Sequence, residues 1–272
     1  MIPTKAQMRE VFQDTLKFFD EDSILHEAIT KTKSRTKVYP ADFAVEVDTH
    51  KAGKVDMIPC RTLQAALKLH DEFPGAKIAV LNFAASQTPG GGVLGGSRAQ
   101  EESLCRSSTL YASLTTETAH EGFYSYHHDN KCGWLASDTC TYSPDVIICR
   151  DDDEYIPARL KPEDFVKIDV VTCAAPHIFS NITISNDELF AIHLSRAKNI
   201  LRVCAYNGVD IFIGGAFGCG AFHSPAEIVA GAWREALKDY AVKFDLVAFA
   251  VKSYKESPNN FDIFKEELSP IM

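Results

Sequence analysis

Apolar runs alternate with helical patterns over the second half of the chain. The runs at residues 165–174, 210–214 and 245–253 are typical of strands that are buried on both faces. Between them, residues 187–206 and 225–240 carry apolar positions at helical spacing. This order of strand, helix, strand, helix and strand predicts a three-layer α/β/α fold with a mixed central sheet.

The N-terminal part of the chain begins with helices. Thr4 and Gln7 form a capping-box pattern, in which two residues three positions apart bond each other's backbone N–H groups at a helix start. We therefore expect a helix from Thr4 to about residue 19 and a second helix at residues 23–32. Both belong to a segment of accessory helices within residues 1–35.

Two strands and two helices are expected next. Partial alternation of apolar and polar residues predicts a short strand at residues 43–47. Thr62 is a suitable N-cap for a helix over residues 63–70. The largely apolar run at residues 77–85 predicts another buried strand, and a helix is expected from Gln100 to about residue 114.

Residues 122–164 interrupt the regular pattern with turn residues and acidic residues. Two short strand-like runs, at residues 139–142 and 146–149, favour a hairpin-like insertion over a separate domain. The acidic run at residues 151–154 is interpreted as a solvated loop. With no low-complexity linker in the sequence, we expect residues 1–272 to form a single domain.

Two glycine-rich segments each follow a predicted buried strand. We call them loop 1 (residues 88–97) and loop 2 (residues 213–225). Ligands of open α/β sheets bind outside the carboxyl ends of the strands, so both loops should face one cleft. Loop 1 also contains G-x-G-x-x-G at residues 90–95, but residues 85–89 separate it from the strand, which disfavours a dinucleotide-binding dehydrogenase.

Composition and charge restrict how an anionic ligand is held. The formal net charge is −9, and no strong basic cluster is visible along the chain. Backbone amides and helix ends are therefore expected to hold anions. There is no apolar stretch of 18 residues and no signal-peptide pattern, so we expect a cytoplasmic or nuclear location. The eight cysteines contain no C-x-x-C pair and are expected to be free thiols.

Loop 1 leads into two adjacent carboxylates, Glu101 and Glu102, at a predicted helix start. Acidic residues at this position also simply complement the helix dipole. Adjacent helical residues point about 100° apart, so the two carboxylates have different tasks. Glycosidic cleavage needs one carboxyl group that protonates a leaving oxygen and then activates water.

The pattern Gly90-Gly91-Gly92-x7-Gln100-Glu101-Glu102 resembles the signature of poly(ADP-ribose) glycohydrolases of the compact bacterial and fungal type. The resemblance extends over some thirty residues, from Val80 to Ser108. It implies a macrodomain fold, with Glu102 as the catalytic acid/base and Glu101 orienting the distal ribose. Asn82 and Gln100 are expected to contact the substrate, as are the amides of residues 90–92.

Loop 2 resembles the diphosphate loop of macrodomains. Backbone N–H groups ahead of a helix start can cradle a diphosphate, and the expected donors are Gly218, Cys219, Gly220 and Ala221. Two aromatic residues, Phe217 and Phe222, are expected to pack on the ribose or the base. In the compact enzymes an aromatic residue here closes the distal end of the ligand, which favours cleavage from chain ends; we assign this role to Phe222. A thiol-nucleophile role for Cys219 is disfavoured because no dedicated base accompanies it.

The resemblance implies hydrolysis of ribose–ribose bonds in poly(ADP-ribose) on modified proteins, with release of ADP-ribose. Two alternatives remain open: removal of single ADP-ribose units from protein side chains, and binding of ADP-ribose without cleavage. We expect no metal, no cofactor, no contact with membranes and no direct nucleic-acid binding, and a monomeric protein.

Overall fold

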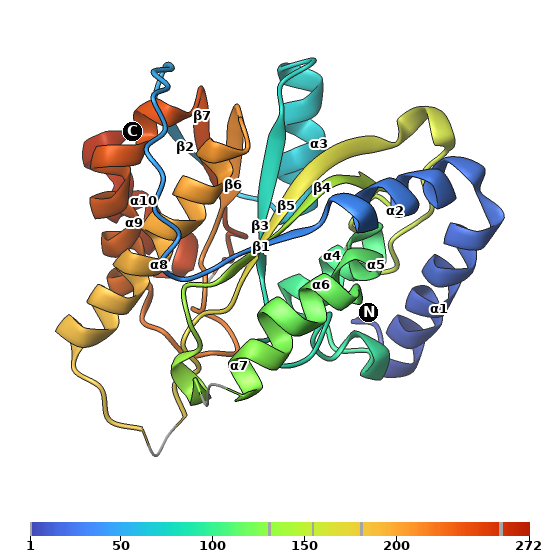
Figure 1. Cartoon of the computed structure of the whole chain (residues 1–272), viewed down its shortest axis with the longest axis horizontal. Helices are drawn as coiled ribbons and strands as arrows, with labels where there is room; N and C mark the ends of the chain where they lie inside the picture. Colours follow the sequence, from blue (N-terminus) through green and yellow to red (C-terminus); the bar gives the residue numbers. More distant parts are fainter. Residues whose placement is uncertain (1, 130–131, 154, 180–181, 256–257) are drawn as a thin grey trace.

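The computed structural model describes residues 2–129, 132–153, 155–179, 182–255 and 258–272. It consists of one mixed sheet covered by helices on both faces, so the predicted three-layer arrangement is confirmed (Figure 1). No helix in these described ranges is long and apolar enough to span a membrane.

The sheet contains seven strands in the order β1-β4-β5-β3-β6-β7-β2. Strands β5, β3, β6, β7 and β2 pair in parallel, whereas β4 pairs antiparallel with both β5 and β1. The carboxyl ends of the central strands β3 and β6 therefore meet at one edge. The strands are β1 (Lys37–Tyr39), β2 (Lys54–Ile58), β3 (Ile78–Phe83), β4 (Cys140–Ile148), β5 (Val166–Cys173), β6 (Ile211–Gly214) and β7 (Leu246–Ala250).

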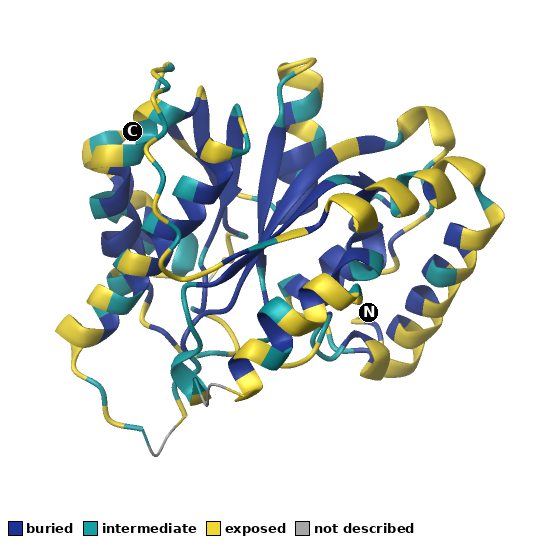
Figure 2. Ribbon diagram, viewed as in Figure 1, coloured by how far each residue is buried: buried dark blue, intermediate teal, exposed yellow. Residues whose placement is uncertain are grey.

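Three C-terminal helices cover one face of the sheet, and α3, α4 and α5 cover the other, with α1 and α2 packed against α4, α5 and β4 (Figure 1). Buried residues fill both interfaces, while the outer sides of the helices are exposed (Figure 2). The helices are α1 (Lys5–Glu21), α2 (Ser23–Arg35), α3 (Thr62–Glu72), α4 (Gln100–Ser107), α5 (Leu110–Leu114), α6 (Glu117–Ala119), α7 (Tyr126–Asp129), α8 (Asn186–Tyr206), α9 (Ala226–Tyr240) and α10 (Asn260–Leu268).

Local capping explains where several helices begin. Thr4 and Gln7 form the predicted capping box at the start of α1, and Asp22 accepts N–H groups at the start of α2. The two accessory helices are therefore confirmed. The helix predicted after Thr62 begins one residue earlier than expected, with Arg61 as its N-cap, and the strand predicted at residues 245–253 ends at Ala250.

The strand predicted at residues 43–47 is wrong. The side chains of Phe43, Val45 and Val47 are half-buried and alternate with exposed neighbours, but the segment pairs with no strand in the part of the chain described. Phe43 and Val47 instead pack against the hydrophobic cluster on the α8–α9 face. The alternation of burial is real, but strand geometry requires a hydrogen-bonded neighbour as well.

The hairpin predicted within residues 122–164 is also wrong. The two strand-like runs belong to one strand, β4, which carries a β-bulge between Ser143 and Val146. Pro144 and Asp145 resemble a turn in sequence, and Asp145 has a positive φ of 57°. Proline within a sheet is tolerated at bulges, so the dipeptide bends β4 instead of reversing the chain.

The helix expected from Gln100 to residue 114 is divided in two. Ser108 adopts an extended conformation with φ −147° and forms an isolated bridge with Ile148. The N–H of Thr109 donates to the carbonyl of Ile147, and the Thr109 hydroxyl accepts the N–H of Ile147. Pairing with β4 thus competes with helical bonding at this point and ends α4 early.

Candidate functional site

Loop 1 lies directly over the two carboxylates of α4. Gly91 has a φ of +56°, and a Cβ atom at this position would lie 2.7 Å from Glu102 Oε1 and 2.9 Å from Glu101 Oε2. Only glycine combines this left-handed conformation with so close an approach. The glycine at position 91 is therefore a steric requirement of the carboxylate pair.

The amides of loop 1 bind the carboxylates. The N–H of Gly92 donates to Glu102 Oε1 at 2.8 Å, the N–H of Gly90 bonds Glu101, and the N–H of Gly91 donates to the carbonyl of Thr88. We expected these three amides to hold the ribose; in the structure those of Gly90 and Gly92 donate to the carboxylates, and that of Gly91 donates within the loop. Loop 1 therefore positions the reactive groups.

Glu101 is buried and connects α4 to the end of β3. Its Oε2 accepts the N–H of Ala85 at 2.8 Å, and its Oε1 accepts the Asn82 amide at 3.4 Å. Burial raises the pKa of the Glu101 carboxyl to about 8, although these donors partly oppose the shift. Near neutral pH the folded protein therefore favours the protonated form of Glu101.

Two buried polar atoms of the two carboxylates and the Asn82 amide have no protein partner among the described residues. They are Glu102 Oε2 and Asn82 Oδ1. Buried polar atoms are almost always hydrogen-bonded, because an unpaired one costs about 1–3 kcal/mol. One carboxyl oxygen and one amide oxygen are thus available for groups that the protein itself does not supply.

Gln100 anchors the start of α4 to the sheet. Its Oε1 accepts the N–H of Phe83 at 2.9 Å, and its Nε2 donates to the carbonyl of Leu81 at 2.7 Å and to the Thr62 hydroxyl at 3.2 Å. The side-chain amide is therefore occupied by strand β3 and helix α3. The sequence analysis missed this anchoring task, since it depends on contacts across the fold.

Loop 1 also rests on the first helix. A Cβ atom at Gly96, where φ is +79°, would collide with the carbonyl oxygen of Lys5. The Arg106 guanidinium donates to the carbonyl of Ser97 at 2.6 Å and closes the loop from the α4 side. The N-terminal accessory segment is thus in direct contact with the loop that covers the carboxylates.

Loop 2 presents backbone donors toward the same end of the sheet. Within the described part of the chain, the N–H groups of Gly218, Gly220 and Ala221 have no protein acceptor, which leaves them available to bind an anion. The N–H of Cys219 differs, because it donates to the carbonyl of Ala216 at 3.1 Å. Burial raises the pKa of the Cys219 thiol to about 12, which argues against a thiolate nucleophile.

The two aromatic residues of loop 2 lie in different environments. Phe217 is buried and packs against Phe83, with the ring centroids 5.6 Å apart. Phe222 stacks on His177, with centroids 4.6 Å apart and an interplanar angle of 9°. Phe217 thus supports the loop from the core side, whereas Phe222 lies in an aromatic stack.

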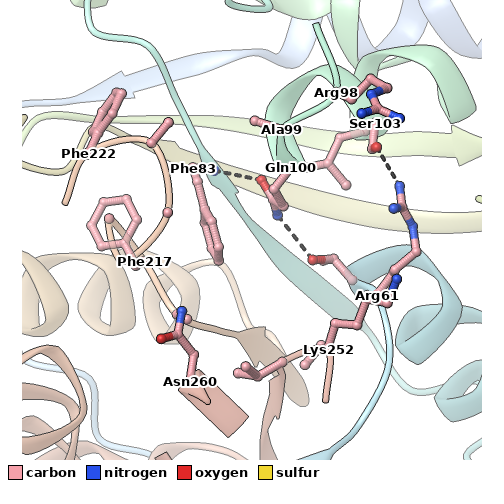
Figure 3. Close-up of a pocket in the computed structure, with 18 of the residues that line it drawn as sticks. Arg61, Phe83, Arg98, Ala99, Gln100, Ser103, Phe217, Phe222, Lys252 and Asn260 are labelled. Atoms are coloured by element: carbon pink, nitrogen blue, oxygen red, sulfur yellow. Dashed lines mark hydrogen bonds between the residues drawn. The ribbon is translucent and has the colours of Figure 1, made fainter. Parts of the chain in front are cut away.

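A cavity of about 510 Å³ lies between loop 2 and the start of α4 (Figure 3). Of the predicted site residues, six line it: Gln100, Phe217, Gly218, Gly220, Ala221 and Phe222. A second group of predicted site residues lies together in and beneath loop 1 and does not line the cavity: Asn82, Gly90, Gly91, Gly92, Glu101 and Glu102. The cavity and the carboxylate cluster are therefore adjacent, with Gln100 between them.

The cavity wall contains charged residues that the sequence analysis missed. Arg61, Arg98 and Lys252 line it, and Figure 3 shows Arg61, Arg98 and Ser103 on the side away from Phe217 and Phe222. Arg61 and Lys252 lie far from loop 1 in the sequence, so no local motif could have indicated them, whereas Arg98 and Ser103 flank the Gln100–Glu102 run.

The interpretation of residues 151–154 as a solvated loop is wrong for Asp152. This side chain is buried and forms an ion pair with Arg61 at 2.9 Å, because a buried carboxylate requires a cationic partner. Asp152 also has a positive φ of 54°. Residue 154 of the same run lies outside the described residues.

One family of catalytic domains matches about half of the chain. The family described as "Microbial-type PARG, catalytic domain" matches residues 15–151. No curated protein sequence matches the chain significantly.

Solved structures resemble the chain over nearly its full length. A crystal structure of poly(ADP-ribose) glycohydrolase from Thermomonospora curvata has a TM-score of 0.81 at 27% identity, covering 96% of this chain and 98% of that chain. The same enzyme bound to the inhibitor ADP-HPD gives a TM-score of 0.78 at 26% identity, with coverages of 95% and 98%. The Deinococcus radiodurans enzyme in complex with ADP-ribose has a TM-score of 0.79 at 27% identity, covering 90% of this chain and 98% of that chain.

Proposed function

This chain belongs to the family of microbial-type PARG catalytic domains, and from that premise we propose that it hydrolyses the ribose–ribose O-glycosidic bonds of poly(ADP-ribose) and releases ADP-ribose. The observation that carries the proposal is the buried Oε2 of Glu102, which has no hydrogen-bond partner among the described residues while Gly92 holds Oε1 in place. A protein that only binds ADP-ribose has no need of such a carboxyl group.

The site accommodates the parts of ADP-ribose separately. Complexes of the similar enzymes with ADP-ribose and with ADP-HPD support a ligand of this class. The diphosphate lies on the amides of Gly218, Gly220 and Ala221, which donate to no acceptor within the described ranges. The distal ribose lies beneath loop 1, where Asn82 Oδ1 accepts one of its hydroxyl groups and Glu101 orients it. The adenosine lies along the remaining cavity wall, formed by Cys60, Arg61, Thr62, Ala250, Val251, Lys252, Asn259 and Asn260.

Cleavage breaks the bond between C1″ of the distal ribose and the 2′ oxygen of the neighbouring unit. Glu102 donates its proton to the departing 2′ oxygen while positive charge develops at C1″. The diphosphate on loop 2 stabilises that charge electrostatically. Glu102 then removes a proton from the incoming water, whose hydroxyl group joins C1″. The proton taken from water restores the acid form of Glu102, and ADP-ribose leaves with its new 1″ hydroxyl group.

Substitution of Glu102 tests this assignment. Glu102→Gln keeps the bond from Gly92 but has no transferable proton, so we expect release of ADP-ribose from polymer to fall by roughly 10²–10⁴-fold. Binding of ADP-ribose, measured by calorimetry, should persist. Glu227→Gln is a matched control, since Glu227 is an exposed glutamate in the first turn of α9. A folded Glu102→Gln protein with wild-type turnover would refute the assignment.

The same assay separates the alternative activities. Wild-type protein is incubated with polymer and with arginine- or serine-linked mono-ADP-ribosylated proteins. We expect the enzyme to release ADP-ribose from polymer and not from the mono-ADP-ribosylated proteins. Release only from the mono-modified proteins would replace the proposal with mono-ADP-ribosyl hydrolysis, and binding without any release would indicate an ADP-ribose-binding domain. We also propose that the enzyme acts on modified proteins as a monomer in the cytoplasm.

A further inference from the structure

A second cavity, of about 320 Å³, adjoins the first. Six residues line both cavities and form their common wall: Arg61, Arg98, Ser103, Asp152, Lys252 and Tyr254. Residues that line only the second cavity include Ile2, Arg106 and Tyr155. A ligand that extends past the common wall would therefore pass directly from one cavity into the other.

The second cavity is locally cationic in an acidic protein. Four cationic residues line it, Arg61, Arg98, Arg106 and Lys252, against two acidic ones, while the whole chain carries a formal net charge of −9. Both carboxylates have partners: Asp152 pairs with Arg61, and Asp153 accepts the N–H of Tyr155 at 2.7 Å. The remaining positive charge favours an anionic ligand.

Arg98 and two tyrosines give the cavity accessible binding groups. Arg98 is exposed, and within the described residues its guanidinium has no ion pair or hydrogen bond. Tyr155 is 47% exposed, so its ring is accessible for stacking, while Tyr254 is 61% exposed with the Lys252 ammonium over one face of its ring at 5.1 Å. A guanidinium suits phosphate oxygens, and a tyrosine ring suits the face of a base.

We propose that the second cavity binds the diphosphate and base of a second ADP-ribose unit of the polymer. The inference rests on the proposed function, because it takes the first unit to occupy the first cavity. A polymer continues from the adenosine ribose through its 2′ oxygen, and the adenosine lies toward Arg61 and Lys252. The next unit therefore meets the common wall and Arg98.

A modified protein is a less suitable occupant of this cavity. It joins ADP-ribose at C1″, beside Glu101 and Glu102, and neither glutamate lines the second cavity. Binding on the adenosine side instead allows an internal unit of a chain to occupy the catalytic cluster. Cleavage within chains would then accompany the release from chain ends that was expected from Phe222.

The decisive variant is Tyr155→Glu, because Tyr155 lines only the second cavity and is exposed. In the Glu102→Gln background, binding of ADP-ribose and of purified long polymer is measured by calorimetry. Tyr155→Glu should weaken polymer binding at least fivefold and change ADP-ribose binding less than twofold. The neutral Tyr155→Gln should lose only the stacking part, and Tyr206→Glu, at an exposed tyrosine on α8, controls for the added charge.

Product sizes give a second readout. On long chains, the wild-type enzyme should release oligomers early, whereas Tyr155→Glu in the otherwise wild-type enzyme should release mainly ADP-ribose. The proposed site for a second ADP-ribose unit would be overturned if Tyr155→Glu bound polymer as tightly as its parent protein. Weaker binding by Tyr155→Glu of mono-ADP-ribosylated protein only would overturn it as well. Either result would leave the proposed hydrolysis intact. That function fails separately, if the wild-type enzyme does not cleave polymer at all.

Discussion

The conformation of loop 1 and the positions of the two carboxylates both depend on Gly91. Its positive φ and the 2.7 Å approach to Glu102 Oε1 exclude a side chain for two independent reasons. A methyl group here would displace either the loop or the carboxylates. Because Glu102 is held by Gly92, the neighbouring residue, such a displacement would reach the reactive oxygen directly.

We expect Gly91→Ala to reduce polymer hydrolysis by about 10²-fold or more, because small misplacements of a catalytic group have effects of this size. The strained backbone should also cost about 1–3 kcal/mol of stability. Gly95→Ala is the matched control in the same loop, since a Cβ atom there meets nothing within 4 Å. Turnover and urea unfolding check both variants; similar activity of the two would contradict the steric argument.

At the residue scale, local patterns predicted the carboxylate cluster well. Glycines and adjacent glutamates are informative because backbone conformation and proton transfer restrict residue type strongly. Gln100 and Cys219 were less predictable. Their polar groups bond Leu81 and Ala216, and the sequence does not specify which nearby groups will be satisfied within the protein. The proposed roles of the site residues remain predictions.

At the scale of elements, the start of α4 is joined to β3 by the Gln100 side chain, which bonds both the N–H of Phe83 and the carbonyl of Leu81. A further bond reaches Thr62, in the first turn of α3. Three elements are thus fixed relative to one another just before the two glutamates. The orientation of Glu101 and Glu102 depends on this junction.

We expect Gln100→Ala to destabilise the protein by about 2–4 kcal/mol, since it removes several hydrogen bonds and leaves buried backbone groups unpaired. Hydrolysis should fall as well, because α4 is no longer fixed to β3. Gln13→Ala, at an exposed position of helix α1, is the control. Urea unfolding followed by circular dichroism measures the difference, and equal midpoints for the two variants would argue against the junction.

Elements with strong local signals were predicted within a few residues, as for α1, α8 and β5. The errors lie where the partner decides the structure. Pro144 and Asp145 form a bulge instead of a turn, because β5 and β1 both pair with β4. The short strands β1 and β2 escaped notice because their few residues carry little periodic signal.

At the scale of the whole molecule, the buried Glu101 links folding to pH. Burial raises its pKa from 4.5 to about 8, so the folded protein retains a proton that the unfolded chain releases within this range. The free energy of unfolding should therefore fall as pH rises from about 4.5 to 8. The maximum slope for one group is about 1.4 kcal/mol per pH unit.

Glu101→Gln tests this link, because its amide cannot titrate. Relative to this variant, the wild-type free energy of unfolding should decrease steadily between pH 5 and pH 8. Denaturant unfolding at several pH values provides the measurement, with Glu227→Gln as the control that keeps the wild-type slope. Parallel pH profiles for wild type and Glu101→Gln would show that Glu101 is ionised throughout.

The cationic lining of the second cavity could not be predicted from the sequence. Arg61 precedes α3, Arg98 follows loop 1, Arg106 lies in α4 and Lys252 follows β7. Linear charge patterning detects only neighbours along the chain, and by that measure the protein has no strong basic cluster. The fold assembles one from single residues in four segments.

The contact of Gly96 with Lys5 shows that helix α1 belongs to the catalytic part of the molecule, although it lies outside the sheet and its covering helices. By topology, α1 and α2 lie outside the sheet and its covering helices and count as additions to the core. By contact, α1 supports the segment that fixes both carboxylates. Substitutions in the first turn of α1 can therefore alter reaction chemistry without touching substrate, and the catalytic unit extends further toward the N-terminus than the sheet fold does.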